Sequence, residues 1–297
     1  MITIIGSINL DLIARVERLP APGETIPGSG FSTAPGGKGA NQALAARRAG
    51  AQVRMIGAVG ADSFADQALA LLREAGVDLS RVKKPSPLTG VAMILVGADG
   101  ENVIAVIPGA NADVAEEDVE AAGLSRDEFV LLQHEVPLPT IEAALRNARA
   151  AGAVSLLNAA PFQPQAADFL SMADYLVVNE TEFDLYAQSL GLEGSDREQR
   201  ARAYTARTGR TIVVTLGGDG VMAAAPDRFL RLPAFPITPV DTVGAGDTFC
   251  GYLAAALSDG LLLEAALRRA AAAGALACLK PGAQPAIPFR SDVDSRL

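Results

Sequence analysis

The sequence is short of several residue types that build metal sites and disulfide frameworks. Its 297 residues include no tryptophan, one histidine and two cysteines, and aromatic residues make up only 5%. The lone histidine, His134, rules out a metal site built on two histidines, and we interpret it as a structural residue. Cys250 and Cys278 lie in Ala/Leu-rich segments, which favours unpaired core thiols over a disulfide or a metal site.

Basic runs and long apolar runs are also missing. Lys and Arg number 25 against 34 Asp and Glu, a net charge of -9, which disfavours nucleic acid and anionic membranes as partners. No apolar run approaches the ~18 residues of a membrane span, and the amino terminus lacks the basic segment of a secretory signal. We therefore expect a soluble, cytoplasmic protein.

Strand-like and helix-like segments alternate along most of the chain. This alternation predicts an α/β fold with a doubly wound, mainly parallel sheet and helices on both faces, in one domain over residues 1–297. The predicted strands are 52–59, 129–136, 154–158 and 175–178, and the predicted helices include 63–75, 140–150 and 261–279.

One segment departs from this alternation. Residues 90–107 form two strand-like runs around an Asp-Gly turn, which predicts a hairpin outside the main sheet. With the turn-rich segment that follows Pro20, it predicts a small β-sheet lid formed by about residues 12–34 and 88–109.

Ligands of parallel α/β sheets bind at the carboxyl ends of the strands. We expect Asn9, Glu135, Asn158 and Asn179 at such ends, with Asn9 and Asp11 close to the end of one apolar strand over 2–14. Because strand side chains alternate, Asn9 and Asp11 would share a face, where an amide and a carboxylate suit a vicinal diol. A solvated strand end would explain the same pair.

A glycine-rich turn precedes the predicted helix that stops at Gly50. Lys38 stands at the start of this helix, where the helix dipole prefers anions, so a phosphate or another anion nearby would account for it. Asn41 in the first turn could reach a sugar hydroxyl. The alternative is a plain glycine turn with an exposed lysine. The segment fits neither a Walker A loop nor a dinucleotide-binding fingerprint.

A second glycine turn, Gly244–Gly246, leads into a buried helix. Unpaired N–H groups and the helix dipole make such a turn an anion site. Asp247 follows directly, and a carboxylate beside an anion site suits a base that takes a proton from a hydroxyl attacking a phosphate. The alternative is that Asp247 is the N-cap of the helix.

Two more segments have both a structural and a functional interpretation. Asn179 and Glu182 have the spacing of a capping box, but Glu182 could instead orient water around Mg²⁺. Residues 211–225 predict a strand, a glycine turn and a second strand, and their glycines would let a flat or phosphorylated ligand approach the backbone.

In combination, these motifs resemble the PfkB family of carbohydrate kinases, and among its members those that phosphorylate ribose. The resemblance covers nearly the whole chain. It rests on Gly6–Asp11, Pro22–Thr25, Gly36–Asn41, Asn179–Glu182, Thr215–Gly217, Asp241–Asp247 and Gly282–Pro285. It implies transfer of a phosphoryl group from ATP to the 5-hydroxyl of D-ribose, with Mg²⁺ on the nucleotide, K⁺ as activator and a homodimer formed through the lid.

The resemblance also implies a role for each matching residue. Asp247 would be the general base, and the turn Gly244, Ala245, Gly246 and Asp247 would hold the transferring phosphoryl group. The sugar would contact Asn9, Asp11, Gly37, Lys38, Gly39, Asn41, Glu135 and Asp247. The nucleotide would contact Asn179, Glu182, Thr215, Leu216, Gly217, Gly218, Asp219, Gly220, Gly246 and Asp247. Glu182 would hold Mg²⁺ through water, and K⁺ would lie near Asp241, Val243, Ala277, Lys280, Gly282 and Ala286.

The chain departs from the family pattern at several positions, and two of these departures bear on ligands. Ala286 stands where many relatives place a hydroxyl near K⁺, which predicts weaker K⁺ dependence, and Ala271 stands where relatives can place a polar residue near the nucleotide. The alternative functions are a PfkB kinase for deoxyribose, another sugar or a nucleoside, and an inactive sugar-binding regulator. The intact base and glycine turn argue against the regulator.

Overall fold

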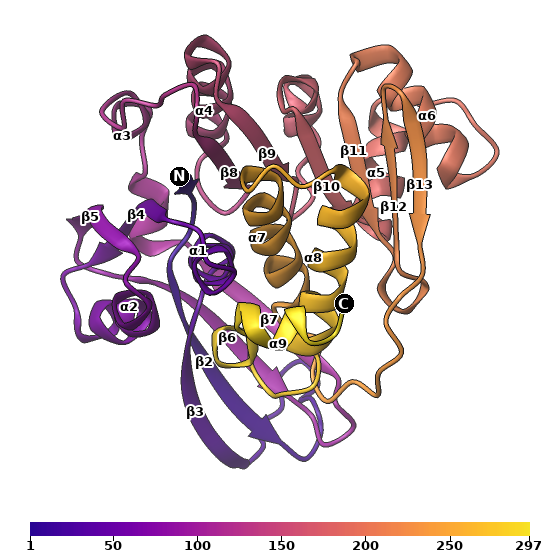
Figure 1. The fold of residues 1–297 in the computed structure, drawn as a ribbon. Helices are drawn as coiled ribbons and strands as arrows, with labels where there is room; N and C mark the ends of the chain where they lie inside the picture. Colours follow the sequence, from indigo (N-terminus) through magenta and orange to yellow (C-terminus); the bar gives the residue numbers. More distant parts are fainter.

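The computed structural model describes residues 1–297, and its centre is a nine-stranded sheet (Figure 1). The strand order is β13-β12-β11-β10-β9-β8-β1-β4-β5, parallel from β11 to β5 and antiparallel at β12 and β13. The strands are β1 (Ile2–Ile5), β4 (Val53–Gly60), β5 (Asp78–Ser86), β8 (Phe129–Gln133), β9 (Val154–Asn158), β10 (Tyr175–Asn179), β11 (Thr211–Thr215), β12 (Val221–Ala225) and β13 (Arg228–Leu232). The predicted mainly parallel sheet is confirmed.

Helices cover both faces of this sheet, as predicted. One face carries α1 (Lys38–Arg48), α2 (Ser63–Ala75), α7 (Ala245–Ser258), α8 (Leu263–Ala277) and α9 (Arg290–Asp294). The other carries α3 (Glu116–Glu120), α4 (Leu138–Ala151), α5 (Glu180–Ser189) and α6 (Arg197–Thr208). Strand side chains alternate between the two cores: Ile4 packs in the core that contains Leu253 of α7, and Ile5 in the core that contains Leu145 of α4.

The ends of α2 show how local sequence fixes an element. Asp62 is the N-cap and accepts a hydrogen bond from the Ala65 N–H, and Gly76 ends the helix with a left-handed φ of 73°. This helix has the predicted bounds, because both stop signals lie in the adjacent sequence.

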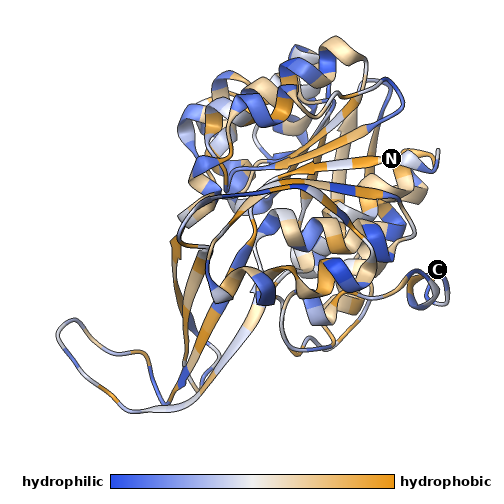
Figure 2. Cartoon of the chain, turned by 90° about the vertical axis from the view of Figure 1, so that its left-hand side faces the viewer, coloured by the Kyte–Doolittle hydropathy of each residue, from blue (hydrophilic) through white to orange (hydrophobic).

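A second, four-stranded sheet has the order β3-β2-β6-β7 and projects from the α/β body (Figure 2). It consists of β2 (Asn9–Val16), β3 (Gly28–Gly36), β6 (Gly90–Val96) and β7 (Asn102–Ile107). The β6–β7 pair is the predicted hairpin and lies outside the main sheet, as expected. Apolar side chains on these strands are exposed, among them Phe31, Met93, Val103 and Ile104.

The amino-terminal segment corrects one prediction. The apolar run over 2–14 is two strands: β1 ends at Ile5 in the main sheet, and β2 begins at Asn9 in the small sheet. Asn9 and Asp11 therefore start a strand of the small sheet and do not end a strand of the main one. The chain crosses between the sheets at Gly6–Ile8. No helix has the length and apolar character needed to cross a membrane.

Candidate active site

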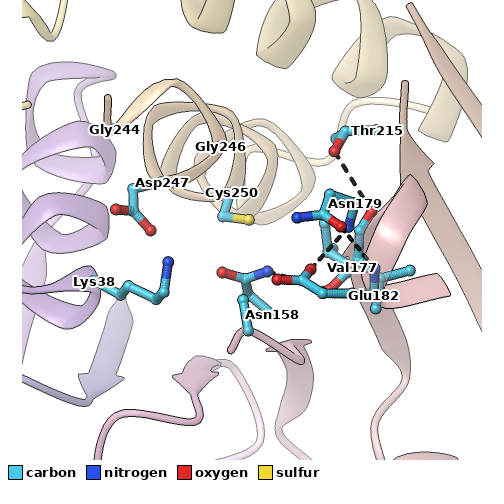
Figure 3. Close-up of a pocket in the computed structure, with 12 residues that line it drawn as sticks. Lys38, Asn158, Val177, Asn179, Glu182, Thr215, Gly244, Gly246, Asp247 and Cys250 are labelled. Atoms are coloured by element: carbon cyan, nitrogen blue, oxygen red, sulfur yellow. Dashed lines mark hydrogen bonds between the residues drawn. The ribbon is translucent and has the colours of Figure 1, made fainter. Parts of the chain in front are cut away.

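Two adjoining cavities lie at the carboxyl edge of the main sheet. The first has a volume of about 220 Å³ and is lined by Asp247, Lys38, Glu182 and the strand-end residues Asn158 and Asn179, among others (Figure 3). The second has a volume of about 520 Å³. Both are lined by Thr215 and Gly246, so they meet at the start of α7.

The structure corrects the N-cap interpretation of Asp247. The N-cap of α7 is Gly244, and Asp247 is the third helical residue, 7% exposed. Its carboxylate does not cap its own helix. It accepts hydrogen bonds from α1 instead, from Asn41 Nδ2 at 2.9 Å to Oδ2 and from Gln42 Nε2 at 2.9 Å to Oδ1. A buried carboxylate held from a different helix is positioned for contact with a ligand.

The glycine turn has the free donors that an anion site needs. Gly244 has a left-handed φ of 74°, and the first intrahelical bond of α7 runs from the Thr248 N–H to the Gly244 carbonyl. The N–H groups of Gly246 and Asp247 donate no hydrogen bond within the chain. The helix dipole adds partial positive charge at this turn. The turn can therefore bind an anion beside the Asp247 carboxylate.

The residues expected at the sugar gather where β2 meets the start of α1. Glu135 accepts hydrogen bonds from Ser7 Oγ at 2.5 Å and from the Lys38 N–H at 3.0 Å. Asn9 Oδ1 accepts from Asn111 Nδ2 at 2.7 Å. Ser7 and Asn111 were not among the predicted site residues.

Glycine is required in this segment by close backbone contacts. Gly37 has a φ of 87°, and a Cβ there would lie 2.8 Å from the Asn9 nitrogen. A Cβ on Gly36 would lie 2.3 Å from Asp11 Oδ1, and one on Gly39 would lie 2.6 Å from the Ser7 nitrogen. The glycines therefore let α1 start against the crossing segment that leads into β2.

The site gathers several negative charges around one lysine. Burial, followed by the negative charges of Glu135 and Asp247, raises the pKa of Asp11 to about 7. The pKa of Lys38 is raised chiefly by Asp247, although burial opposes the shift. Lys38 points into the first cavity between Asp247 and Asn158 (Figure 3). It is therefore not the exposed lysine of a plain glycine turn.

Asn41 lies near the start of α1, as predicted, and also contacts Asp247. It was expected to reach a sugar hydroxyl, yet its Nδ2 donates to Asp247. Its Oδ1 is buried and has no partner within the chain, so this oxygen remains free to accept from a ligand. The neighbouring Gln42, which we did not predict, also contacts Asp247. Its role could not be read from the sequence, because its partners lie on distant elements.

The residues expected at the nucleotide line both cavities. Asn179 and Glu182 form a reciprocal capping box, with bonds of 2.8 and 2.9 Å, so the structural interpretation of this pair is confirmed. Glu182 also lines the first cavity, where burial raises the pKa of its carboxyl. The second cavity is lined by Gly217, Gly218, Gly220 and Ala271, whereas Leu216 and Asp219 line neither cavity.

The residues expected at a K⁺ ion meet behind the glycine turn. Asp241 accepts hydrogen bonds from the Val243 N–H at 3.0 Å and from the Gly282 N–H at 2.8 Å, which joins the two segments. The Lys280 N–H donates to the Ala277 carbonyl at 3.4 Å, and Ala286 is buried. No three carboxylate, thiol or imidazole groups converge in the chain, so a dedicated multi-carboxylate metal site is absent.

His134 and the two cysteines are buried, as predicted, and Cys250 lines the first cavity and Cys278 the second. His134 Nδ1 is 3.2 Å from the Pro161 carbonyl oxygen and 3.3 Å from the Tyr186 hydroxyl, and burial lowers its pKa to about 4. Cys250 and Cys278 are unpaired and buried.

Comparison with known proteins agrees with this geometry. The sequence profile of the pfkB family carbohydrate kinases matches residues 1–290. The chain belongs to the pfkB family of carbohydrate kinases. It is an enzyme of this family, a phosphotransferase of the ribokinase type.

The relatives span the full length of the chain. A ribokinase from Bacillus subtilis is 37% identical over 302 residues, which cover 100% of this chain and 99% of the relative. A deoxyribokinase from Salmonella typhi is 34% identical and covers 97% of this chain and 95% of its own length. The structure of an Arabidopsis thaliana ribokinase complexed with ribose and ATP superposes with a TM-score of 0.86 and 32% identity, over 99% of this chain and 97% of that one.

Proposed function

We propose that this protein phosphorylates D-ribose on its 5-hydroxyl, with ATP as the phosphoryl donor. The observation that carries the proposal is the position of Asp247, whose buried carboxylate lies beside the free N–H groups of Gly246 and of its own backbone. A base next to an anion site is the arrangement that phosphoryl transfer to a hydroxyl needs. The relatives named for ribose support the choice of sugar.

The sugar would be held by the cluster at the start of β2. Asn9 and Asp11 share a face of that strand, and Glu135 is fixed by Ser7 and the Lys38 N–H. Amide and carboxylate groups together can donate to and accept from the hydroxyls of a vicinal diol. Gly37 and Gly39 let the start of α1 pack against the segment that leads into β2, and the free Oδ1 of Asn41 can accept one further hydroxyl.

The reaction is a displacement at the terminal phosphorus of ATP. Asp247 accepts the proton of the 5-hydroxyl, the sugar oxygen forms the new bond to phosphorus, and the bond to the ADP oxygen breaks. The N–H groups of the glycine turn stabilise the charge on the phosphoryl oxygens, an effect worth roughly 10²–10³ in rate per donor in comparable sites. Lys38 adds positive charge in the same cavity. The base contributes about 10²–10⁴.

We propose that the nucleotide occupies both cavities. Its phosphates would lie in the first cavity beside Asn179, Glu182 and Thr215, and its base in the larger second cavity beside Ala271. Mg²⁺ would neutralise the phosphate charge when it is bound to ATP. Glu182 is the carboxylate that fits a water-mediated contact with this ion, because it lines the cavity and no cluster of three metal-ligating side chains is present to hold the ion directly.

A K⁺ ion fits the segments that Asp241 joins. Backbone carbonyls from these segments would hold it. The side-chain amide of Gln284 is buried near this loop and has no hydrogen-bond partner in the chain. The carbonyl-bearing residues are Asp241, Val243, Ala277, Lys280, Gly282 and Ala286. Such an ion would stiffen the turn at Gly244 without contacting the sugar.

We further propose that the four-stranded sheet is a lid over the sugar and the dimer interface. It carries exposed apolar side chains on both of its faces, Phe31, Met93 and Val103 on one and Val106 on the other, which are 51–71% exposed. A surface of this kind is typical of a protein–protein contact. If the proposal holds, the double substitution Met93→Lys with Ile104→Lys lowers the molar mass in light scattering from dimer to monomer. An unchanged mass would contradict it.

The second candidate is a deoxyribokinase, which a relative that covers 97% of this chain supports. Asp11 argues for ribose, because loss of the 2-hydroxyl would leave a buried polar group unpaired, at a cost of about 1–3 kcal/mol. The deciding experiment is ADP release with ribose, 2-deoxyribose, fructose and nucleosides as acceptors. We expect the highest kcat/KM with ribose. A higher value with another acceptor would contradict the proposal.

A further inference from the structure

We infer that Gln42, supported by Gln133, is a positioning residue that holds the Asp247 carboxylate in the orientation in which it accepts the proton. This inference rests on the proposed role of Asp247. Nothing in the glycine motif or in the phosphoryl-transfer chemistry itself requires a glutamine at this point of α1.

Gln42 joins three elements through a chain of buried hydrogen bonds. Its Nε2 lies 2.9 Å from Asp247 Oδ1 and 3.0 Å from Asn158 Oδ1. Its Oε1 accepts from Gln133 Nε2 at 2.6 Å. Gln42 and Gln133 are 0% exposed, so no water competes for these bonds. The chain runs from the end of β8 through α1 to the base on α7 and to the end of β9.

The charge of Asp247 sets the direction of every bond in this chain. An ionised carboxylate only accepts hydrogen bonds, so Gln42 must present its NH₂ group to Asp247. The carbonyl oxygen of Gln42 then faces Gln133, which must present its own NH₂ group. A reversed Gln42 amide would place its oxygen against the carboxylate and against Asn158 Oδ1, and that contact is repulsive.

Both oxygens of Asp247 therefore face amide donors, Asn41 at Oδ2 and Gln42 at Oδ1. Amide donors stabilise the charged form of a carboxylate and fix its orientation. The base is thereby oriented before the sugar hydroxyl arrives with its proton. Each oxygen retains lone-pair capacity to take that proton, which leaves for solvent after the phosphorylated sugar is released.

The second bond of Gln42 fixes the position of the base relative to the sheet. Asn158 lines the same cavity as Asp247, and its Nδ2 donates to the Val177 carbonyl at 3.2 Å. The base is therefore linked to the strand ends that border the phosphate cavity. A misplacement of about 1 Å in such a site can reduce the rate about 10²-fold.

The test compares Gln42→Met and Gln133→Met, which keep much of the side-chain volume but remove the amides. We expect Gln42→Met to lower kcat about tenfold to a hundredfold, the effect of losing one hydrogen bond to a charged group. The acidic limb of the kcat–pH profile should move up by about one pH unit. KM for ribose and for ATP should change little, because neither residue is assigned a contact with substrate.

Gln133→Met should shift the same limb in the same direction by less. The double variant should be no slower than Gln42→Met alone, because Gln133 acts through Gln42. Thr205→Val is the matched control, since it removes from α6 a buried hydroxyl that donates to the Ala224 carbonyl of β12, and neither residue lines the two cavities. It should lower Tm and leave the pH profile unchanged.

A purely structural role for Gln42 would give a lower Tm with an unmoved acidic limb, and that result would overturn the inference. Additive losses in the double variant would overturn the relay from Gln133. Gln133→Met leaves the direct partner of Asp247 in place, so it tests the chain even if Gln42→Met does not fold. Failure of the proposed function looks different: the wild-type protein itself would release no ADP with ribose.

Discussion

Gly244 packs directly against Ala283. A Cβ added to Gly244 would lie 2.8 Å from the Cβ of Ala283, and the φ of Gly244 is 74°. The turn that starts α7 thus packs against the loop that follows Gly282. Asp241 holds the same loop by accepting a hydrogen bond from the Gly282 N–H. The geometry of the anion-binding N–H groups depends on a contact between segments 39 residues apart (283 − 244).

This contact predicts that alanine substitutions at Gly244 and Gly246 differ in their effect on stability. Gly244→Ala should cost about 1–2 kcal/mol in backbone strain alone, and more from the contact with Ala283. Gly246→Ala should leave the free energy of unfolding nearly unchanged, because no atom lies within 4 Å of its added Cβ.

Both substitutions should lower kcat, since both alter the turn that would hold the phosphoryl group. Thermal unfolding of the two variants together with ADP release separates the effects. Equal stability of the two variants would show that the packing of Gly244 on Ala283 does not constrain the turn.

The raised pKa of Asp11 predicts a pH-dependent stability. Burial and the charges of Glu135 and Asp247 raise this pKa from 3.8 to about 7. Between pH 3.8 and about 7, the Asp11 carboxyl is ionised in the unfolded chain and protonated in the folded chain. The free energy of unfolding therefore decreases as the pH rises toward 7.

Asp11→Asn should therefore be more stable than the wild type above pH 7 and no different near pH 4. Urea unfolding without ligand at several pH values measures this difference. Asp66→Asn, at a side chain 75% exposed, is the control and should show no such trend. A constant difference between Asp11→Asn and wild type at all pH values would contradict the assignment.

The segments joined by Asp241 should determine the response to K⁺. Asp241→Ala removes both bonds to Val243 and Gly282, so we expect lower kcat and loss of K⁺ activation. Ala286→Ser introduces the hydroxyl that many relatives place near K⁺ and should increase the activation by K⁺. ADP release with K⁺ exchanged for choline measures both. If neither variant changes the K⁺ response, the ion binds elsewhere.

Much of the architecture could be predicted from local sequence. Apolar strands separated by amphipathic helices indicated the parallel sheet, and the Asp-Gly turn indicated the β6–β7 hairpin. The edge strands β5 and β13 were missed. Residues Asp78–Ser86 include two lysines, an arginine and a proline, so they lack the apolar pattern of a buried strand.

The details of the site depended on contacts that the sequence does not show. The sequence predicts Asn9 near the end of a strand, because nothing in the apolar run marks the change of sheet after Ile5. The sequence alone does not exclude an N-cap role for Asp247. Its actual bonds, to Asn41 and Gln42, join residues more than 200 positions apart. Tertiary contacts of this kind decide what a buried polar side chain does.

Replacement of the base tests the central claim most directly. Asp247→Asn keeps the size of the side chain and removes its charge, so we predict that ribose binding, measured by calorimetry, stays within about threefold of wild type. ADP release with ribose should fall by at least about 10²–10⁴. The wild-type protein should convert ribose to ribose 5-phosphate under the same conditions. Near-normal turnover by the Asp247→Asn variant would contradict the account.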